Sequence, residues 1–162
     1  MNEELFARSD DFVNALSDNV HESDEEKFLI YRSSDILYAM STDYVMEIFT
    51  SVDITKVPMV PEFVSGVINL RGQIVPIVDF RLLLGRFPEV EQPCAIILDI
   101  NGTSIGILVD TVDQMVDISR SHILPVPAQN EHRMVNGMCT VPGIPQTVMI
   151  VDATALVHME QF

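Results

Sequence analysis

Apolar residues recur with a period close to two along most of the chain, a pattern typical of β-strands that bury one face. From Lys27 onward, short apolar runs alternate with Gly, Pro, Asn and Asp at frequent intervals. Many short strands with few helices indicate closed or nearly closed antiparallel barrels rather than a parallel sheet. The runs predict strands at 27–33, 36–40, 67–70, 73–79, 95–100, 104–109, 114–119 and 146–152, and helical turns at 42–45, 61–66, 80–85 and 152–162.

Turn residues divide these strands into two clusters. Asn101-Gly102 lies between two apolar runs, and this dipeptide accepts the positive φ angles of a two-residue hairpin turn. Arg71-Gly72 lies in the same way between two earlier strands. The clusters, roughly 27–90 and 91–150, predict a mostly β protein built from two small barrels.

Residues 1–26 have a different composition. They contain nine acidic residues against Arg8 alone, so about half of the net charge of −15 lies in this segment. Its apolar residues recur at intervals of three, four and seven, which predicts an amphipathic helix followed by a solvated linker at 21–26. The helix either packs on the barrels or docks on a partner, and the sequence leaves both open. The apolar positions are Leu5, Phe6, Phe12, Val13, Leu16 and Val20.

The charge balance restricts the partners. Affinity for nucleic acid comes largely from cations that displace counterions, and the chain has nine Lys plus Arg against 24 Asp plus Glu. DNA, RNA and bare anionic membranes are therefore poor partners. No apolar run approaches the roughly 18 residues of a membrane span, and the acidic N-terminus lacks the basic start of a signal peptide. We expect a cytoplasmic protein that does not insert directly into the membrane.

No motif in the sequence predicts an enzyme. The four histidines are scattered, Cys94 and Cys139 are isolated, and neither a phosphate-binding glycine loop nor a nucleophile elbow occurs. Asp110-Thr111 follows an apolar strand, as in the aspartic peptidases, but Val112 stands where their motif has glycine. We therefore expect no catalytic residue, metal or cofactor, and we interpret Asp110 and Asp113 as turn residues at strand ends.

Arg71 lies in the middle of an apolar run, INLRGQIVPIVDF at 68–80. Burial of an unpaired guanidinium is strongly unfavourable, and arginine does not lose its proton instead. Arg71 therefore needs an acidic partner, carbonyl groups or water. Glu47 is the preferred partner because it is also a lone charge among apolar residues; the alternative is an ordinary solvent-exposed arginine in a turn.

Residues 57–85, VPMVPEFVSGVINLRGQIVPIVDFRLLLG, resemble the signature of the CheW family, the coupling proteins of bacterial chemotaxis. The shared pattern is P-x-F-x-x-G-V-x-N-L-R-G-x-I-V-P-I-V-D-[LF]-R, which runs here from Pro61 to Arg81. Weaker similarity extends over about 26–155 and leaves the acidic N-terminal segment outside.

The resemblance implies two five-stranded, SH3-like barrels that share a core, within a domain at 27–155. It also implies a non-enzymatic adaptor that couples the cytoplasmic tips of chemoreceptors to the regulatory domain of the histidine kinase CheA. Such an adaptor would associate with membrane-bound receptor arrays through its partners.

The resemblance also implies two contact regions. Kinase contacts fall on Thr42, Val45 and Glu47 in the first barrel. Receptor contacts fall on a groove between the barrels, where glycines would let a receptor helix approach the backbone and Arg71, paired with Glu47, would anchor it. The groove residues are Gly66, Arg71, Gly106, Val112 and Met115, of which Val112 and Met115 are equally compatible with a place in the core.

Two alternatives remain within this resemblance. One is a freestanding CheW-like regulatory module that binds the kinase without a receptor, and the other is an adaptor of a non-swimming chemosensory pathway. A small-barrel hydrolase would need an acid pair or a metal site, and the sequence indicates neither.

Overall fold

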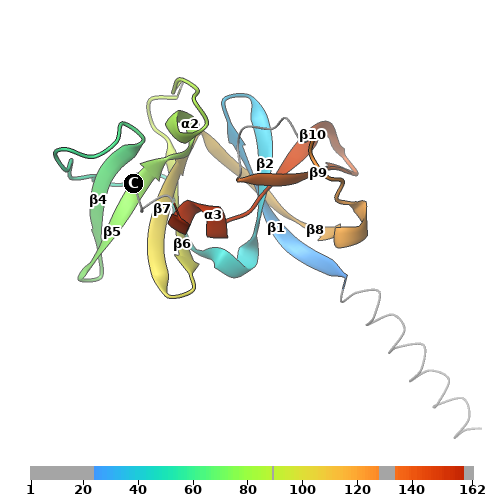
Figure 1. Ribbon diagram of the computed structural model, residues 1–162, viewed down its shortest axis with the longest axis horizontal. Helices are drawn as coiled ribbons and strands as arrows, with labels where there is room; N and C mark the ends of the chain where they lie inside the picture. The colour runs from blue at the N-terminus through green and yellow to red at the C-terminus, as the bar shows by residue number, and fades with distance from the viewer. Residues whose placement is uncertain (1–23, 89, 128–133, 159–162) are drawn as a thin grey trace, which may run out of the picture.

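The computed structural model describes residues 24–88, 90–127 and 134–158. Within these ranges the chain is mostly β, as the sequence predicts, and Figure 1 shows two strand-rich halves side by side. β4 and β5 lie towards one end of the molecule, and β8 and β9 towards the other. The helix predicted within residues 1–26 lies outside the described residues, as do residues 159–162 of the predicted closing helix.

The strands of the described residues have five to nine residues each and are joined mainly by tight turns and short helical segments. No helix in these ranges is long and apolar enough to cross a membrane. The strands are β1 (Glu25–Ser33), β2 (Ile36–Ser41), β3 (Val45–Phe49), β4 (Val64–Leu70), β5 (Gln73–Asp79), β6 (Cys94–Ile100), β7 (Thr103–Val109), β8 (Thr111–Ser119), β9 (Val135–Val141) and β10 (Ile144–Val151). The helical segments are η1 (Thr42–Tyr44), α2 (Phe80–Leu83), η2 (Arg120–His122) and α3 (Thr154–Val157).

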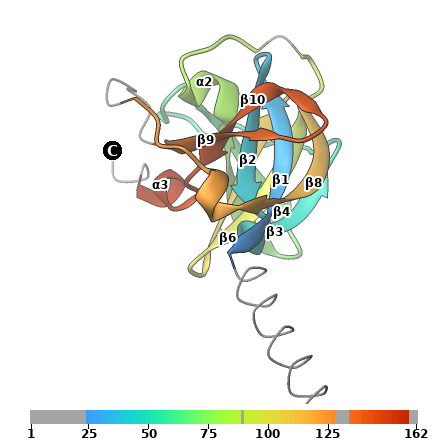
Figure 2. The same ribbon diagram turned by 90° about the vertical axis from the view of Figure 1, so that its right-hand side faces the viewer.

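Each of the two five-stranded sheets takes strands from both parts of the sequence. The first sheet has the order β8-β1-β2-β10-β9, and the second has the order β3-β6-β7-β5-β4. Figure 2 shows β9 and β10 crossing in front of β1 and β2. The sheets do not follow the expected division at 27–90 and 91–150, because β1 and β2 pair with β8 and β10 from the second part of the chain.

The strand order contains an internal repeat, in which β1 to β5 correspond to β6 to β10. In both sheets the third and fourth strands pair in parallel and the other neighbours are antiparallel. The strand registers also agree. Val45 of β3 pairs with Leu98 of β6, and the equivalent Val112 of β8 pairs with Tyr31 of β1. A bulge follows each pair. Each barrel therefore combines the first two strands of one repeat with the last three strands of the other.

In each sheet an isolated bridge joins one edge strand to the segment that follows the other edge strand, and this contact closes the sheet into a barrel. A glycine precedes one bridged residue in both barrels. A Cβ at Gly66 would overlap the Thr55 carbonyl oxygen, and a Cβ at Gly137 would lie 2.5 Å from Ile123 Cγ2. Any larger residue would hold the edges apart. The bridges are Thr55 with Val67 in the second sheet and Leu124 with Met138 in the first.

Buried side chains form one cluster inside each barrel and a larger cluster shared by both sheets. Tyr31 and Tyr38 of the first sheet contribute to the shared core, and the Phe80 ring lies edge-on to them, with centroids at 5.4 and 4.9 Å. These aromatic contacts are favourable beyond the burial of their area. The two SH3-like subdomains therefore share a core.

The hairpin turns agree with the sequence, whereas one predicted helix does not. Arg71-Gly72 and Asn101-Gly102 have positive φ at both residues, as a two-residue turn requires. The predicted helical turn at 61–66 is wrong, because β4 begins at Val64 and continues through Gly66. The positive φ of 145° at Gly66 belongs to a bulged strand position rather than to a helix end.

Candidate functional site

The predicted kinase-contact residues lie where the chain passes from the first sheet to the second. Ser41 Oγ accepts a hydrogen bond from the Asp43 N–H and so caps the short turn η1, which lies within the predicted helical turn at 42–45. Thr42 belongs to this turn, and Val45 and Glu47 lie on one face of β3. All three residues are half-buried.

β3 is an edge strand of the second sheet, and its other face carries exposed apolar side chains. Met46 is 48% exposed and Ile48 is 37% exposed. An edge strand with exposed apolar residues is suited to contact with another protein. No motif marks these two residues, and their alternation with Val45 and Glu47 is the sequence signal that identifies this face.

Arg71 forms an ion pair with Glu47 through its Nη2 and the carboxylate Oε1. The Arg71 side chain is 71% exposed in the β4–β5 turn, whereas that of Glu47 is only 24% exposed. The predicted pair is therefore present. Arg71 is also exposed to solvent in a turn, so both interpretations of this arginine describe part of what is seen. Since β3 and β4 are the two edge strands of the second sheet, the pair spans the seam at which this barrel closes.

Glu47, Gly106 and Gly66 lie on one row around the second barrel. The row continues from Glu47 through Ile97, Gly106 and Ile77 to Gly66. A Cβ at Gly106 would overlap Ile77 Cδ1 and lie 3.0 Å from Ile97 Cδ1. The space beside both buried glycines is filled by the same chain, so the expected approach of a receptor helix to them does not fit the structure.

Val112 and Met115 lie on β8, an edge strand of the first sheet. Val112 is half-buried and packs against the shared core, whereas Met115 is 54% exposed. In the internal repeat, Val112 corresponds to Val45 and Met115 to Ile48, because the two strands pair with their neighbours in the same register. The two predicted contact regions therefore use equivalent strands of the two repeats.

A buried arginine holds the two sheets together. Arg81, at 3% exposure, donates from Nε and Nη2 to the two carboxylate oxygens of Asp79, each at 2.9 Å. Its Nη1 lies 3.1 Å from Asp110 Oδ1 and 3.0 Å from the Val90 carbonyl oxygen. Asp110 Oδ2 accepts from the Ser34 N–H at 2.9 Å. Asp110 is thus a buried anchor as well as a strand-end residue.

The surroundings of these buried groups shift their pKa values. Burial by itself lowers the pKa of Arg81, but the hydrogen bonds and charges of Asp79 and Asp110 outweigh it and raise the pKa. Burial raises the pKa of Tyr31 well above its ordinary value, with a smaller contribution from Tyr38. Arg81 therefore stays charged, and Tyr31 stays neutral, at physiological pH.

Arg71 and Met115 are the exposed residues among the candidate contacts. One pocket in the described part of the chain lies beside Ser41 and Asp152, and another lies beside Val52 and Pro93. None of the predicted kinase-contact or receptor-contact residues lines either pocket. Recognition at these two exposed residues would use the β4–β5 turn and one face of β8.

Two five-stranded, SH3-like subdomains with a shared core define the class of this protein. A family model described as the CheW-like domain matches residues 27–161. The chain belongs to this family, whose members act as adaptors in chemotaxis.

Similar proteins agree with this assignment. The chemotaxis protein CheW of Rhizobium meliloti is 30% identical over 124 residues, which are 72% of this chain and 79% of that protein. The chemotaxis protein CheW of Klebsiella aerogenes is 32% identical over 104 residues, and the match spans less than two thirds of either chain, 63% of each. The crystal structure of the scaffolding protein TtCheW from Thermoanaerobacter tengcongensis superimposes with a TM-score of 0.72 at 29% identity, covering 78% of this chain and 88% of that one.

Proposed function

We propose that this protein is a non-enzymatic adaptor that couples the cytoplasmic tips of chemoreceptors to the regulatory domain of a CheA-type histidine kinase. In this role it works in the cytoplasm, associated with membrane-bound receptor arrays through its partners. Membership of the CheW-like family and the similarity to a scaffolding protein support the proposal.

The ion pair between Arg71 and Glu47 is the observation that carries the proposal. It joins a residue expected to contact the receptor to one expected to contact the kinase. A receptor that competes for the Arg71 guanidinium changes the surroundings of Glu47 on β3, so the pair offers a direct physical link between the two partners. Exposed Ile48 supplies apolar surface next to Glu47, and exposed Met115 supplies apolar surface within the expected receptor-contact region.

The test uses the purified full chain with the kinase and a receptor cytoplasmic fragment. Co-precipitation measures binding to each partner, and phosphate incorporation measures kinase activity. Coupling requires that both partners bind and that the receptor activates the kinase only when this chain is present. Binding of the kinase alone would favour the freestanding regulatory module, and binding of neither would overturn the proposal.

Substitutions at the pair locate the effect. Arg71→Glu places like charge opposite Glu47 and should weaken receptor-dependent kinase activation about tenfold or more. The matched control is Lys56→Glu, an equal charge change at an exposed residue outside the pair. The double variant Arg71→Glu with Glu47→Arg restores the opposite charges. Recovery in the double variant shows that the pair matters, whereas a wild-type response of Arg71→Glu alone would exclude Arg71 from the site.

A further inference from the structure

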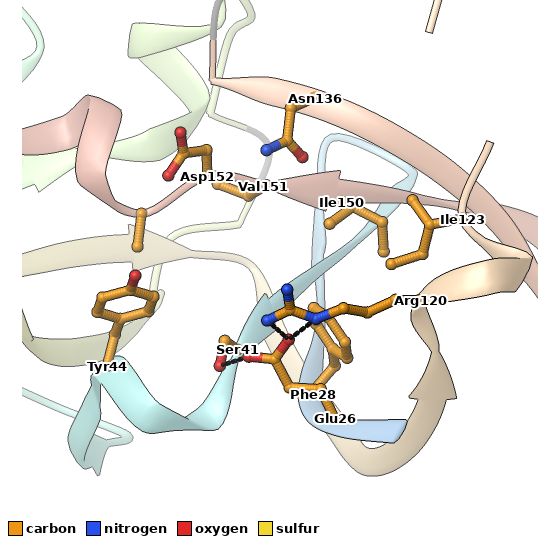
Figure 3. A pocket seen from close by; sticks show the side chains of 11 residues that line it. Glu26, Phe28, Ser41, Tyr44, Arg120, Ile123, Asn136, Ile150, Val151 and Asp152 are labelled. Atoms are coloured by element: carbon orange, nitrogen blue, oxygen red, sulfur yellow. Dashed lines mark hydrogen bonds and ion pairs between the residues drawn. The ribbon is translucent and has the colours of Figure 1, made fainter. Parts of the chain in front are cut away.

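A cavity of about 360 Å³ opens beside the first sheet, between β1, β2 and the end of β10. Figure 3 shows Asp152 and Asn136 on one side of it and the Glu26–Ser41–Arg120 cluster on the other. Its apolar lining includes Phe28, Ile123 and Ile150. None of the residues expected to contact the kinase or the receptor lines this cavity.

The equivalent carboxylate in the other repeat shows which contacts can form at this position. Asp152 comes directly after β10 and corresponds to Asp79, the last residue of β5, so Thr154 corresponds to Arg81. Asp79 Oδ1 accepts hydrogen bonds from the backbone N–H and the Nε of Arg81, and its Oδ2 accepts from Nη2 at 2.9 Å. In one repeat, therefore, a guanidinium occupies both carboxylate oxygens.

Asp152 has only half of this arrangement. Its Oδ1 accepts from the Thr154 backbone N–H at 3.0 Å and from Thr154 Oγ1 at 2.6 Å, so the hydroxyl replaces the Nε donor. No donor from the described residues reaches Oδ2. Ala153 also takes the place of the bulky Phe80, which leaves room beside the carboxylate.

The charges around the cavity favour a cationic ligand. Arg120 donates to Glu26 Oε2 from Nε at 3.2 Å and from Nη2 at 2.9 Å, so these two charges offset each other. The carboxylate of Asp152 remains without a cation among the described residues. The side chains of Asn136 and Tyr44 add polar atoms that make no hydrogen bond within the described ranges, and both line the cavity.

We propose that this cavity is a guanidinium-binding site that takes an arginine side chain of a partner protein. The guanidinium reproduces at Asp152 Oδ2 the contact that Arg81 makes with Asp79. Arginine fits better than lysine because its planar fork matches a carboxylate, and its stem packs on the apolar lining. The net charge of −15 attracts basic protein surfaces to this chain.

The first test is an NMR titration of the ¹⁵N-labelled full chain with N-acetyl-L-arginine amide, a blocked arginine that mimics a residue within a protein. The expected result is a saturable shift of the Thr154 amide and the Asn136 side-chain amide. N-acetyl-L-citrulline amide, which has nearly the same shape without the charge, should produce no shift. Equal shifts with both compounds would overturn the proposal. A site that binds free L-arginine but not the blocked form would also overturn it, because the ligand would then be a metabolite.

Two variants test the role of Asp152. Asp152→Asn keeps an oxygen for Thr154 but removes the charge, and should weaken binding of the blocked arginine by about tenfold or more. Thr154→Arg rebuilds the arrangement of the other repeat, so the chain should fill its own site and lose binding without loss of thermal stability. The matched control Asp117→Asn removes an exposed carboxylate elsewhere on the first sheet and should bind normally. Unchanged binding in both Asp152→Asn and Thr154→Arg would overturn the assignment.

The chain's own Arg133 is the competing occupant, since it precedes Met134, whose carbonyl oxygen accepts from the Asp152 N–H at 2.7 Å. Arg133→Gln separates the two cases. Equal binding in the natural chain and in Arg133→Gln supports a site open to a partner. Binding that appears only in Arg133→Gln shows a site filled from within and overturns the proposal.

Discussion

Arg81 contacts Asp110 at the point where the chain leaves the second sheet for the first. The guanidinium Nη1 lies 3.1 Å from Asp110 Oδ1, and both side chains are almost fully buried. Asp110 follows β7 of the second sheet and precedes β8 of the first. A charged contact therefore fixes the junction between the two barrels.

We predict that Arg81→Leu is strongly destabilising. The substitution leaves two buried carboxylates, Asp79 and Asp110, without a counter-charge, a change that typically costs about 3–5 kcal/mol. Urea unfolding followed by circular dichroism measures the free energy of unfolding. Arg120→Leu is the control, because the exposed pair of Arg120 and Glu26 should contribute less than about 1 kcal/mol. Similar losses in both variants would show that the buried network has no special role.

Tyr31 carries a second testable feature, a buried hydroxyl. This hydroxyl has no hydrogen-bond partner among the described residues, and the side chain is fully buried. Tyr31→Phe removes an unsatisfied polar group while keeping the ring contacts with Tyr38 and Phe80. We expect a gain of about 1 kcal/mol or more in the free energy of unfolding. A lower melting temperature would show that the hydroxyl is satisfied.

The raised pKa of Tyr31 also predicts a loss of stability at alkaline pH. Its folded-state pKa exceeds that of the unfolded chain, near 10, so the unfolded state releases its proton first. The stability is fully present below about pH 10 and falls, by up to about 1.4 kcal/mol per pH unit, as the pH rises towards the folded-state pKa. Unfolding curves between pH 9 and 11 measure this slope, which should be smaller in Tyr31→Phe.

Gly106 and Gly66 should respond to substitution through internal packing. In Gly106→Ala the new Cβ meets the flexible end of Ile77, so we expect a loss of about 1–3 kcal/mol that Ile77→Val partly restores. In Gly66→Ala the Cβ meets the Thr55 backbone at a positive φ, so the loss should be larger and no side-chain truncation should rescue it. Normal stability with lost receptor binding in Gly106→Ala would instead assign this glycine to the interface.

Ile48 and Met115 should separate the two partners. They occupy equivalent exposed positions in the two repeats, so substitution by lysine should leave the fold intact. Ile48→Lys should weaken kinase binding about tenfold and spare the receptor, and Met115→Lys should do the opposite. Isothermal titration with each partner measures both affinities. Loss of the same partner in both variants would contradict the assignment of the two strands.

The sequence predicts local features because local chemistry determines them. Asn101-Gly102 and Arg71-Gly72 form turns since their backbone angles follow from the residues themselves. The contact of Arg71 with Glu47 is also predictable, because each is a lone charge in an apolar run.

Contacts between residues far apart in the sequence cannot be predicted in this way. The parallel pairing of β2 with β10 joins residues far apart in the chain, and period-two patterns do not specify a partner strand. Gly66 resembles a helix end because glycine serves both there and at a strand bulge. Arg81 resembles an exposed helical residue, and only the tertiary structure places Asp110 beside it.

The interleaving of the two repeats has a consequence for biosynthesis. When residue 90 has been made, β1 and β2 still lack β8, β9 and β10, and the second sheet still lacks β6 and β7. Neither barrel is complete until strands of the later repeat emerge, so the chain gains stability late and passes through a stage with open sheet edges. Once the later repeats have emerged, two chains whose sheet edges are still open can exchange them, since each supplies what the other lacks, and the product is a domain-swapped dimer.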